Sequence, residues 1–128
     1  MKTLDTVIQT IEKHRLIESG DRILIALSGG PDSVALAQLL HRLRRRYRLQ
    51  LGAVYINHQL RPRAAVKEEK FCQTLCDRLG IPLTIIRENI PARAKRERKG
   101  IEETARDFRY ETFATIAVSE NYARIALG

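Results

Sequence analysis

Hydrophobic residues along the 128-residue chain follow two periodicities, and segments of the two kinds alternate. Apolar positions spaced three and four apart predict helices that bury one face, whereas short apolar runs predict parallel strands covered on both faces. The clearest run extends from Ile23 to Leu27. The pattern predicts helices over 3–18, 32–47, 65–79 and 101–118, and strands over 22–27, 51–57, 83–87 and 124–127.

This alternation predicts an α/β fold, a doubly wound parallel sheet with helices on both faces. Connections between parallel strands are right-handed, which limits the possible strand orders. We expect strand 22–27 in the middle, strands 51–57 and 83–87 on one side of it, and strand 124–127 on the other. Ligands of such sheets bind beyond the carboxyl ends of the strands, so functional residues are expected there.

Length and composition indicate one folded domain, 1–128. The sequence stops at Gly128, directly after a predicted strand, so we expect this domain to be incomplete at its C-terminus. Apolar residues make up 44% and charged residues 30% of the chain, which excludes a disordered chain. No apolar run exceeds five residues, which excludes a transmembrane helix or signal peptide in this sequence. We therefore expect a cytoplasmic protein with no membrane partner.

The chain is strongly basic, with 23 Lys and Arg against 15 Asp and Glu and a formal net charge of +8. Such a surplus favours a polyanionic partner. Basic residues gather in segments 42–48 and 93–99. Segment 93–99 is a candidate for contact with RNA phosphates, although a run of charge is also typical of a solvated face. Segment 42–48 surrounds a predicted helix end, where cations are favourable in any case.

Two cysteines, Cys72 and Cys76, are four residues apart on the predicted helix 65–79. That spacing places both on the apolar face with Leu75 and Leu79. They form no Cys-x-x-Cys pair and have no neighbouring metal ligands in the sequence. We expect two free thiols packed in the core.

The segment with the strongest chemical signal is Ser28-Gly29-Gly30-Pro31-Asp32-Ser33, between a predicted strand and a predicted helix. Two glycines let consecutive N–H groups point into one concavity, and the following helix adds its positive end. The serines add hydroxyl groups. Together these features predict a cradle for phosphate, in which Asp32 would act through a bridging Mg²⁺ ion. The alternative is a capped turn in which Asp32 only stabilises the helix N-terminus.

Three segments, in this order, resemble motifs of the N-type ATP pyrophosphatases. Residues 28–33 are similar to the pyrophosphate loop of that superfamily. Residues 56–62 resemble a segment usually read as Asp-His-Gly-Leu-Arg in its tRNA(Ile)-lysidine synthetase family, with Asn57 and Gln59 in place of the acidic residue and the glycine. Residues 101–110 resemble the Glu-x-x-Ala-Arg-x-x-Arg-Tyr helix of that family.

The resemblance implies a ligase that splits ATP, with Mg²⁺, into AMP and pyrophosphate. In that family the wobble cytidine of tRNA(Ile) with a CAU anticodon is adenylated, and free L-lysine displaces AMP to give lysidine. The family continues with a His-His-x-Asp-Asp-Gln motif where this sequence ends, so we expect residues 1–128 alone to be inactive.

Two other interpretations stay open. One is another enzyme of the superfamily, either an amide-forming synthetase or a tRNA thiolase, although the lack of a Cys-x-x-Cys pair argues against the thiolase. The other is a nucleotide-binding or RNA-binding module without turnover.

The resemblance also assigns residues to the site. It implies that Ser28, Gly29, Gly30, Pro31, Asp32 and Ser33 hold the ATP phosphates, that Asp32 binds Mg²⁺ and that Arg109 approaches the α-phosphate. Asp32 and Arg109 are thus the candidate catalytic residues. Arg106 shares a helix face with Arg109, but its spacing also suits an ion pair with Glu102, and spacing alone favours that pair. His58 follows a strand end and is a candidate contact for the nucleotide.

Overall fold

The computed structural model describes residues 9, 13–28 and 30–127. Most of the predicted helix 3–18, together with Gly29 and Gly128, lies outside the described residues. In chain order the elements are β1 (Arg22–Leu27), α2 (Pro31–Tyr47), β2 (Gln50–Asn57), α3 (Pro62–Leu79), β3 (Leu83–Arg87), α4 (Ile90–Glu97), α5 (Ile101–Ser119) and β4 (Arg124–Leu127).

The described strands form one sheet in the order β3-β2-β1-β4, and every pair is parallel. The register places Leu27, the last residue of β1, beside Tyr55, and Asn57, the last residue of β2, beside Arg87. The predicted fold class and strand order are confirmed. The parallel pairing brings all four carboxyl ends to one edge of the sheet, which we call the carboxyl edge, opposite the amino edge.

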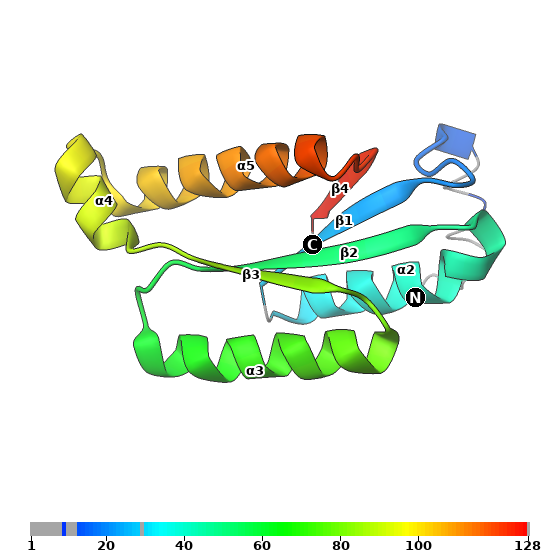
Figure 1. Ribbon diagram of the computed structural model, residues 1–128, viewed down its shortest axis with the longest axis horizontal. Coiled ribbons are helices and arrows are strands. Elements are labelled where there is room, and N and C mark those ends of the chain that lie inside the picture. The colour runs from blue at the N-terminus through cyan, green and yellow to red at the C-terminus, as the bar shows by residue number, and fades with distance from the viewer. Residues whose placement is uncertain (1–8, 10–12, 29, 128) are drawn as a thin grey trace.

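Helices cover both faces of this sheet (Figure 1). Side chains alternate along a strand, so Ile23 and Ile25 pack with α2 and α3 on one face, whereas Leu24 packs with Phe113 of α5 on the other. All four side chains are buried, which explains why β1 is an unbroken apolar run. Among the described residues, no helix combines the length and apolar character needed to cross a membrane.

Prolines begin several of the helices, where a missing N–H costs nothing. Pro31 is the first residue of α2, as predicted, and Pro62 is the first residue of α3. Helix α3 therefore starts three residues before the predicted position 65. It ends at Gly80, whose φ of 67° lies in the left-handed region that suits glycine.

The basic segment 93–99 overlaps helix α4 (Ile90–Glu97), which the hydrophobic pattern did not predict. Helix α4 has only eight residues and two buried positions, Ile90 and Ala94, too few for a helical period to be visible. The Asn89 side chain caps it by accepting a hydrogen bond from the Ala92 N–H at 3.0 Å. The sequence does carry a signal for the start of this helix: the capping residue Asn89, with Pro91 two positions later.

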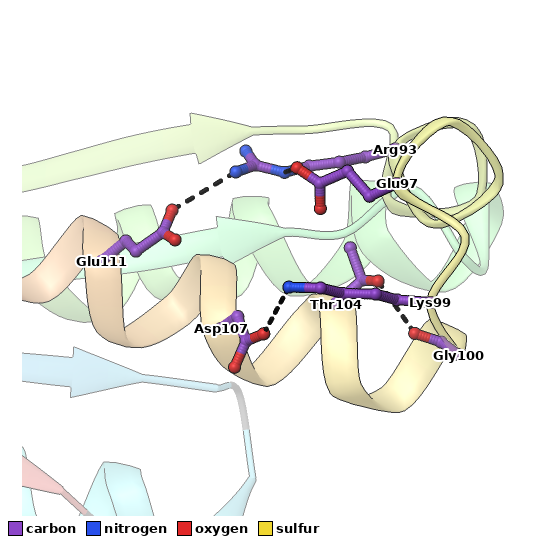
Figure 2. A network of polar contacts seen from close by, with 7 residues as sticks. All are labelled: Arg93, Glu97, Lys99, Gly100, Thr104, Asp107 and Glu111. Atoms are coloured by element: carbon purple, nitrogen blue, oxygen red, sulfur yellow. Dashed lines mark hydrogen bonds and ion pairs between the residues drawn. The ribbon is translucent and has the colours of Figure 1, made fainter.

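Ion pairs fasten α4 and the loop after it to α5 (Figure 2). The Arg93 guanidinium lies 3.3 Å from a carboxylate oxygen of Glu97 and 3.3 Å from one of Glu111. The Lys99 ammonium lies 3.2 Å from Asp107. Two of the cations in segment 93–99 are therefore engaged in holding the two helices together.

Cys72 and Cys76 are free and buried on α3, as the sequence predicts. Burial raises the pKa of both thiols to about 11, and the neighbouring charge of Glu68 adds to the effect at Cys72. Both cysteines are therefore uncharged members of the core at neutral pH.

Polar groups at the amino edge of the sheet bind to one another. The Arg124 guanidinium donates to the Asp21 carboxylate, and the Arg22 guanidinium lies 4.6 Å from the centre of the Tyr122 ring. Tyr122 packs directly over Gly52, where an added Cβ would lie 1.9 Å from the Tyr122 hydroxyl oxygen. This edge is therefore closed by side chains, and Gly52 is needed for the close approach.

Candidate functional site

A cavity of about 500 Å³ opens at the carboxyl edge, beyond the ends of β1 and β2. Its walls come from strands β1, β2 and β4, from helices α2, α3 and α5, and from the loops after β1 and β2. The predicted site residues Ser28, Ser33, His58 and Arg109 line it. Gly30, Pro31, Asp32 and Arg106 are not among its lining residues, and Gly29 lies outside the described residues.

The loop after β1 is held by its own hydroxyl groups. The buried Ser33 hydroxyl donates to the Gly30 carbonyl oxygen at 3.1 Å and accepts from the Ser28 N–H at 3.1 Å. The Ser28 hydroxyl oxygen accepts from the Gly30 N–H at 3.3 Å and lies 3.1 Å from the Ser33 oxygen. The serines thus shape the loop before any ligand arrives, a role that the sequence did not reveal.

Gly30 is the N-cap of α2 and Pro31 is its first residue. The helix has no side-chain cap at this end, so its positive end is open to an anion. Asp32 lies exposed in the first turn. No cluster of three or more His, Cys, Asp or Glu side chains suited to a metal occurs among the described residues. A single carboxylate suits Mg²⁺ only where ligand oxygens and water supply the remaining coordination.

His58, in the loop after β2, and Arg109, on α5, both line the cavity. Burial, and next the nearby Arg109 charge, lower the pKa of His58 below its usual value. His58 is therefore neutral at neutral pH. Its buried Nδ1 has no hydrogen-bond partner among the described residues. Leaving this buried polar atom without a partner costs free energy.

The turn after β2 forms another part of the rim. Gln59 adopts a φ of 57°, in the left-handed region that a glycine would occupy without strain. The Asn57 side-chain oxygen accepts a hydrogen bond from the Gln59 N–H at 2.8 Å and so supports this conformation. The two departures from the resembling motif, Asn57 and Gln59, are therefore structurally coupled.

Sequence reasoning missed Tyr55 and Glu68, which also line the cavity. The Tyr55 hydroxyl donates to the Glu68 carboxylate at 2.7 Å. Burial and this contact raise the pKa of Tyr55 far above its usual value, so the hydroxyl stays protonated. No short motif joins a strand residue to a residue thirteen positions later on α3, so only the fold reveals this pair.

The two arginines of α5 differ in position. Both are exposed, and their guanidinium groups lie 5.8 Å (Arg106) and 5.5 Å (Arg109) from the centre of the Tyr110 ring, but only Arg109 lines the cavity. Arg106 makes no ion pair with Glu102 in the part of the chain that the structure describes, so the pair favoured by spacing is absent there. Of the two arginines, Arg109 is the one placed on the cavity wall, and the contact of either with phosphate stays a prediction.

The profile of the PP-loop domain family matches residues 2–128. This chain belongs to that family. The segment 28–33, which we now call the PP-loop, follows β1 and ends in the first turn of α2.

Two curated relatives extend the comparison. The chain is 40% identical over 124 residues to the tRNA(Ile)-lysidine synthase of Clostridioides difficile, with 97% of this chain and 27% of that protein aligned. It is 43% identical over 117 residues to the bifunctional protein TilS/HprT of Listeria monocytogenes, with 91% of this chain and 18% of that protein aligned. The chain spans about a quarter or less of the length of these relatives.

A solved structure supports the fold. The U34-tRNA thiolase NcsA from Methanococcus maripaludis, described with its [4Fe-4S] cluster, superposes with a TM-score of 0.75 at 18% identity. The match covers 95% of this chain and 45% of the thiolase. At that identity the likeness concerns the PP-loop fold alone.

Proposed function

We propose that this PP-loop domain binds ATP for an enzyme that converts the wobble cytidine of tRNA(Ile) to lysidine. The observation that carries the proposal is 40% identity to a tRNA(Ile)-lysidine synthase over 97% of this chain. The enzyme would be a ligase that adenylates the C2 oxygen of cytidine, releases pyrophosphate, and then joins L-lysine to C2 as AMP leaves. The tRNA would be the one with a CAU anticodon.

The geometry of the carboxyl edge supports ATP as the nucleotide. The first turn of α2, which has no side-chain cap, offers backbone N–H groups and a positive helix end to the phosphates. Arg109 would steady negative charge on the α-phosphate as pyrophosphate departs, because a guanidinium fork fits phosphate oxygens. His58, which lines the cavity and is neutral, would contact the nucleoside.

Asp32 would hold Mg²⁺ together with the phosphate oxygens of ATP. The bound ion would neutralise phosphate charge and make the α-phosphorus a better electrophile. Asp32 fits this role because it is exposed beside the PP-loop. Its carboxylate would otherwise repel the phosphates.

The thiolase alternative gains no support from the described residues. Cys72 and Cys76 are packed in the core on α3, and neither lines the cavity. Their raised pKa values keep them from acting as thiolates at neutral pH.

Part of segment 93–99 is suited to contact tRNA phosphates. Arg93 and Lys99 are engaged with α5 (Figure 2). Lys95, Arg96 and Arg98 are exposed and make no ion pair with any described residue. These three cations are therefore the ones available for an RNA backbone.

This partner assignment can be tested with two triple variants. Replacing Lys95, Arg96 and Arg98 by Ala should weaken tRNA binding about tenfold and flatten its salt dependence. Replacing Arg42, Arg45 and Arg48 by Ala removes the same charge near the C-terminal end of α2, the end away from the PP-loop. This variant should change tRNA binding little. Equal losses in both variants would show that only net charge matters.

The activity is tested with the complete gene product, ATP, Mg²⁺, L-lysine and tRNA(Ile) transcripts. We expect AMP and pyrophosphate to form only with the CAU anticodon present, and lysine to become attached to that cytidine. AMP formation that is independent of tRNA and lysine, or ATP binding without turnover, would contradict the proposed ligase. Incorporation of sulfur into the tRNA would support the thiolase instead.

A further inference from the structure

Asn57 connects the cavity rim to a group of charged residues outside it. Its Oδ1 accepts from the Gln59 N–H at 2.8 Å, and its Nδ2 donates to Glu69 Oε2 at 2.8 Å. A backbone N–H only donates and an ionised carboxylate only accepts, so one neighbour needs an acceptor and the other a donor. The Asn57 amide supplies both, which also fixes its orientation.

Glu69 is in turn held by Arg87, which lies beside Asn57 in the register of β2 and β3. The guanidinium approaches both carboxylate oxygens, with Nη2 2.6 Å from Oε1 and Nε 3.2 Å from Oε2. This fork, together with the Asn57 amide, lowers the pKa of Glu69 although burial opposes it. Glu69 is thus a fixed, ionised acceptor whose side chain is only 15% exposed.

We propose that Arg87 and Glu69 act through Asn57 as positioning residues that hold His58 and Gln59 in place on the cavity wall. Asn57 lines the cavity, whereas Glu69 and Arg87 are not among its lining residues and act without touching the nucleotide. Gln59 adopts a backbone conformation that is unfavourable for a residue with a side chain, so the turn depends on the Asn57 contact. The proposal rests on ATP binding in this cavity, as put forward under the proposed function.

Two substitutions can reverse which of the side chains at positions 57 and 69 donates the hydrogen bond between them. Asn57→Asp keeps an acceptor for the Gln59 N–H but turns a carboxylate oxygen toward Glu69, where two like charges repel. Glu69→Gln alone keeps an acceptor for Asn57. The double variant restores a donor and an acceptor with their positions exchanged, because the new amide at position 69 can donate to the new carboxylate at position 57.

The experiment measures the Kd for ATP with Mg²⁺ in the complete gene product, at a temperature where each variant is folded. Asn57→Asp should raise the Kd about tenfold, Glu69→Gln less than about threefold, and the double variant should return to within about threefold of the native value. Asp21→Asn, which breaks a similar ion pair at the amino edge, is the matched control. It should lower the melting temperature and leave the Kd unchanged.

A Kd for Asn57→Asp equal to the native value, or a double variant no better than Asn57→Asp, would overturn the positioning role. Arg87→Gln gives a second test at a side chain that is 57% exposed, and we expect a rise in Kd of about threefold. An unchanged Kd with only a lower melting temperature would show that the group merely supports the fold. A native protein that binds no ATP would overturn the proposed function and this inference together.

Discussion

The same strands form both edges of the sheet, but the polar groups at the two edges have different surroundings. At the amino edge, Asp21 pairs with Arg124, Arg22 lies over Tyr122, and Tyr122 covers Gly52. At the carboxyl edge a cavity opens, and the N-terminal end of α2 has no side-chain cap. In a parallel sheet, residues that follow the strands lie at one edge and residues that precede them lie at the other. The paired polar groups and the cavity are therefore at opposite edges.

The contrast assigns stability to one edge and binding to the other. The N-terminal end of α2 at the carboxyl edge lacks a side-chain cap. Leaving its N–H groups without partners costs free energy, which a bound anion would recover. Substitutions at the carboxyl edge should therefore change ATP affinity or turnover, and substitutions at the amino edge should change the free energy of unfolding.

The largest effect is expected from Asp32→Ala. If Asp32 holds Mg²⁺, this variant should lose about a hundredfold or more of Mg²⁺-dependent AMP formation. The side chain is exposed and its charge only helps to stabilise the first turn of α2, so the melting temperature should fall by a few degrees at most. Rates of AMP formation at several Mg²⁺ concentrations check this, and native activity in the variant would refute the metal role.

The arginine pair gives the next largest effect. Arg109→Ala should weaken ATP binding by roughly 10- to 100-fold, because a charge-assisted contact contributes about 1.5–3 kcal/mol. Arg106→Ala, three residues earlier on α5 and outside the cavity lining, should change the Kd less than about threefold. Calorimetry on both variants decides the matter, and the reverse order would mean that Arg106 is the phosphate contact.

At the amino edge, Gly52→Ala should destabilise the fold by about 1–3 kcal/mol, because the new Cβ collides with Tyr122. Adding Tyr122→Ala should relieve part of that loss, so the two changes should not be additive. Denaturant unfolding measures all three variants. The ATP affinity of folded Gly52→Ala should match the native value, and a weaker affinity would show that the two edges are coupled.

The smallest effect concerns the Asp21–Arg124 pair. Burial alone would raise the pKa of Asp21, but the Glu18 N–H and Arg124 together hold it below 3.8, its usual value. The carboxylate therefore stabilises the fold above about pH 4, and this contribution is lost as the pH falls through the lower, folded-state pKa. Asp21→Asn should cost about 1 kcal/mol at pH 7 and almost nothing near pH 2 in urea titrations. A cost that does not depend on pH would contradict this origin.

The sequence was sufficient for the parts of the molecule that depend on local pattern. Strand β1 could be predicted because its residues are buried on both faces, and the turn from β1 into α2 because glycine and proline have local roles at the start of a helix. The core position of Cys72 and Cys76 followed from helical spacing. These features need no knowledge of distant partners.

The features that escaped prediction depend on distant partners or on very short elements. Helix α4 buries only Ile90 and Ala94, so it leaves no visible period. The Tyr55–Glu68 contact and the group formed by Asn57, Glu69 and Arg87 depend on how α3 lies beside β2 and β3. Spacing alone also suggested a Glu102–Arg106 pair, but Arg106 lies against Tyr110 instead. Nearby positions on a helix permit such a pair without requiring it.

Hydrogen exchange measured by mass spectrometry on the complete gene product, with and without ATP and Mg²⁺, tests the central claim most directly. The account predicts slower exchange in peptides that contain the PP-loop and residues 57–60, and unchanged exchange in peptides that contain Gly52 or residues 120–124. Protection at the amino edge, or no protection in the PP-loop at saturating ATP, would contradict it.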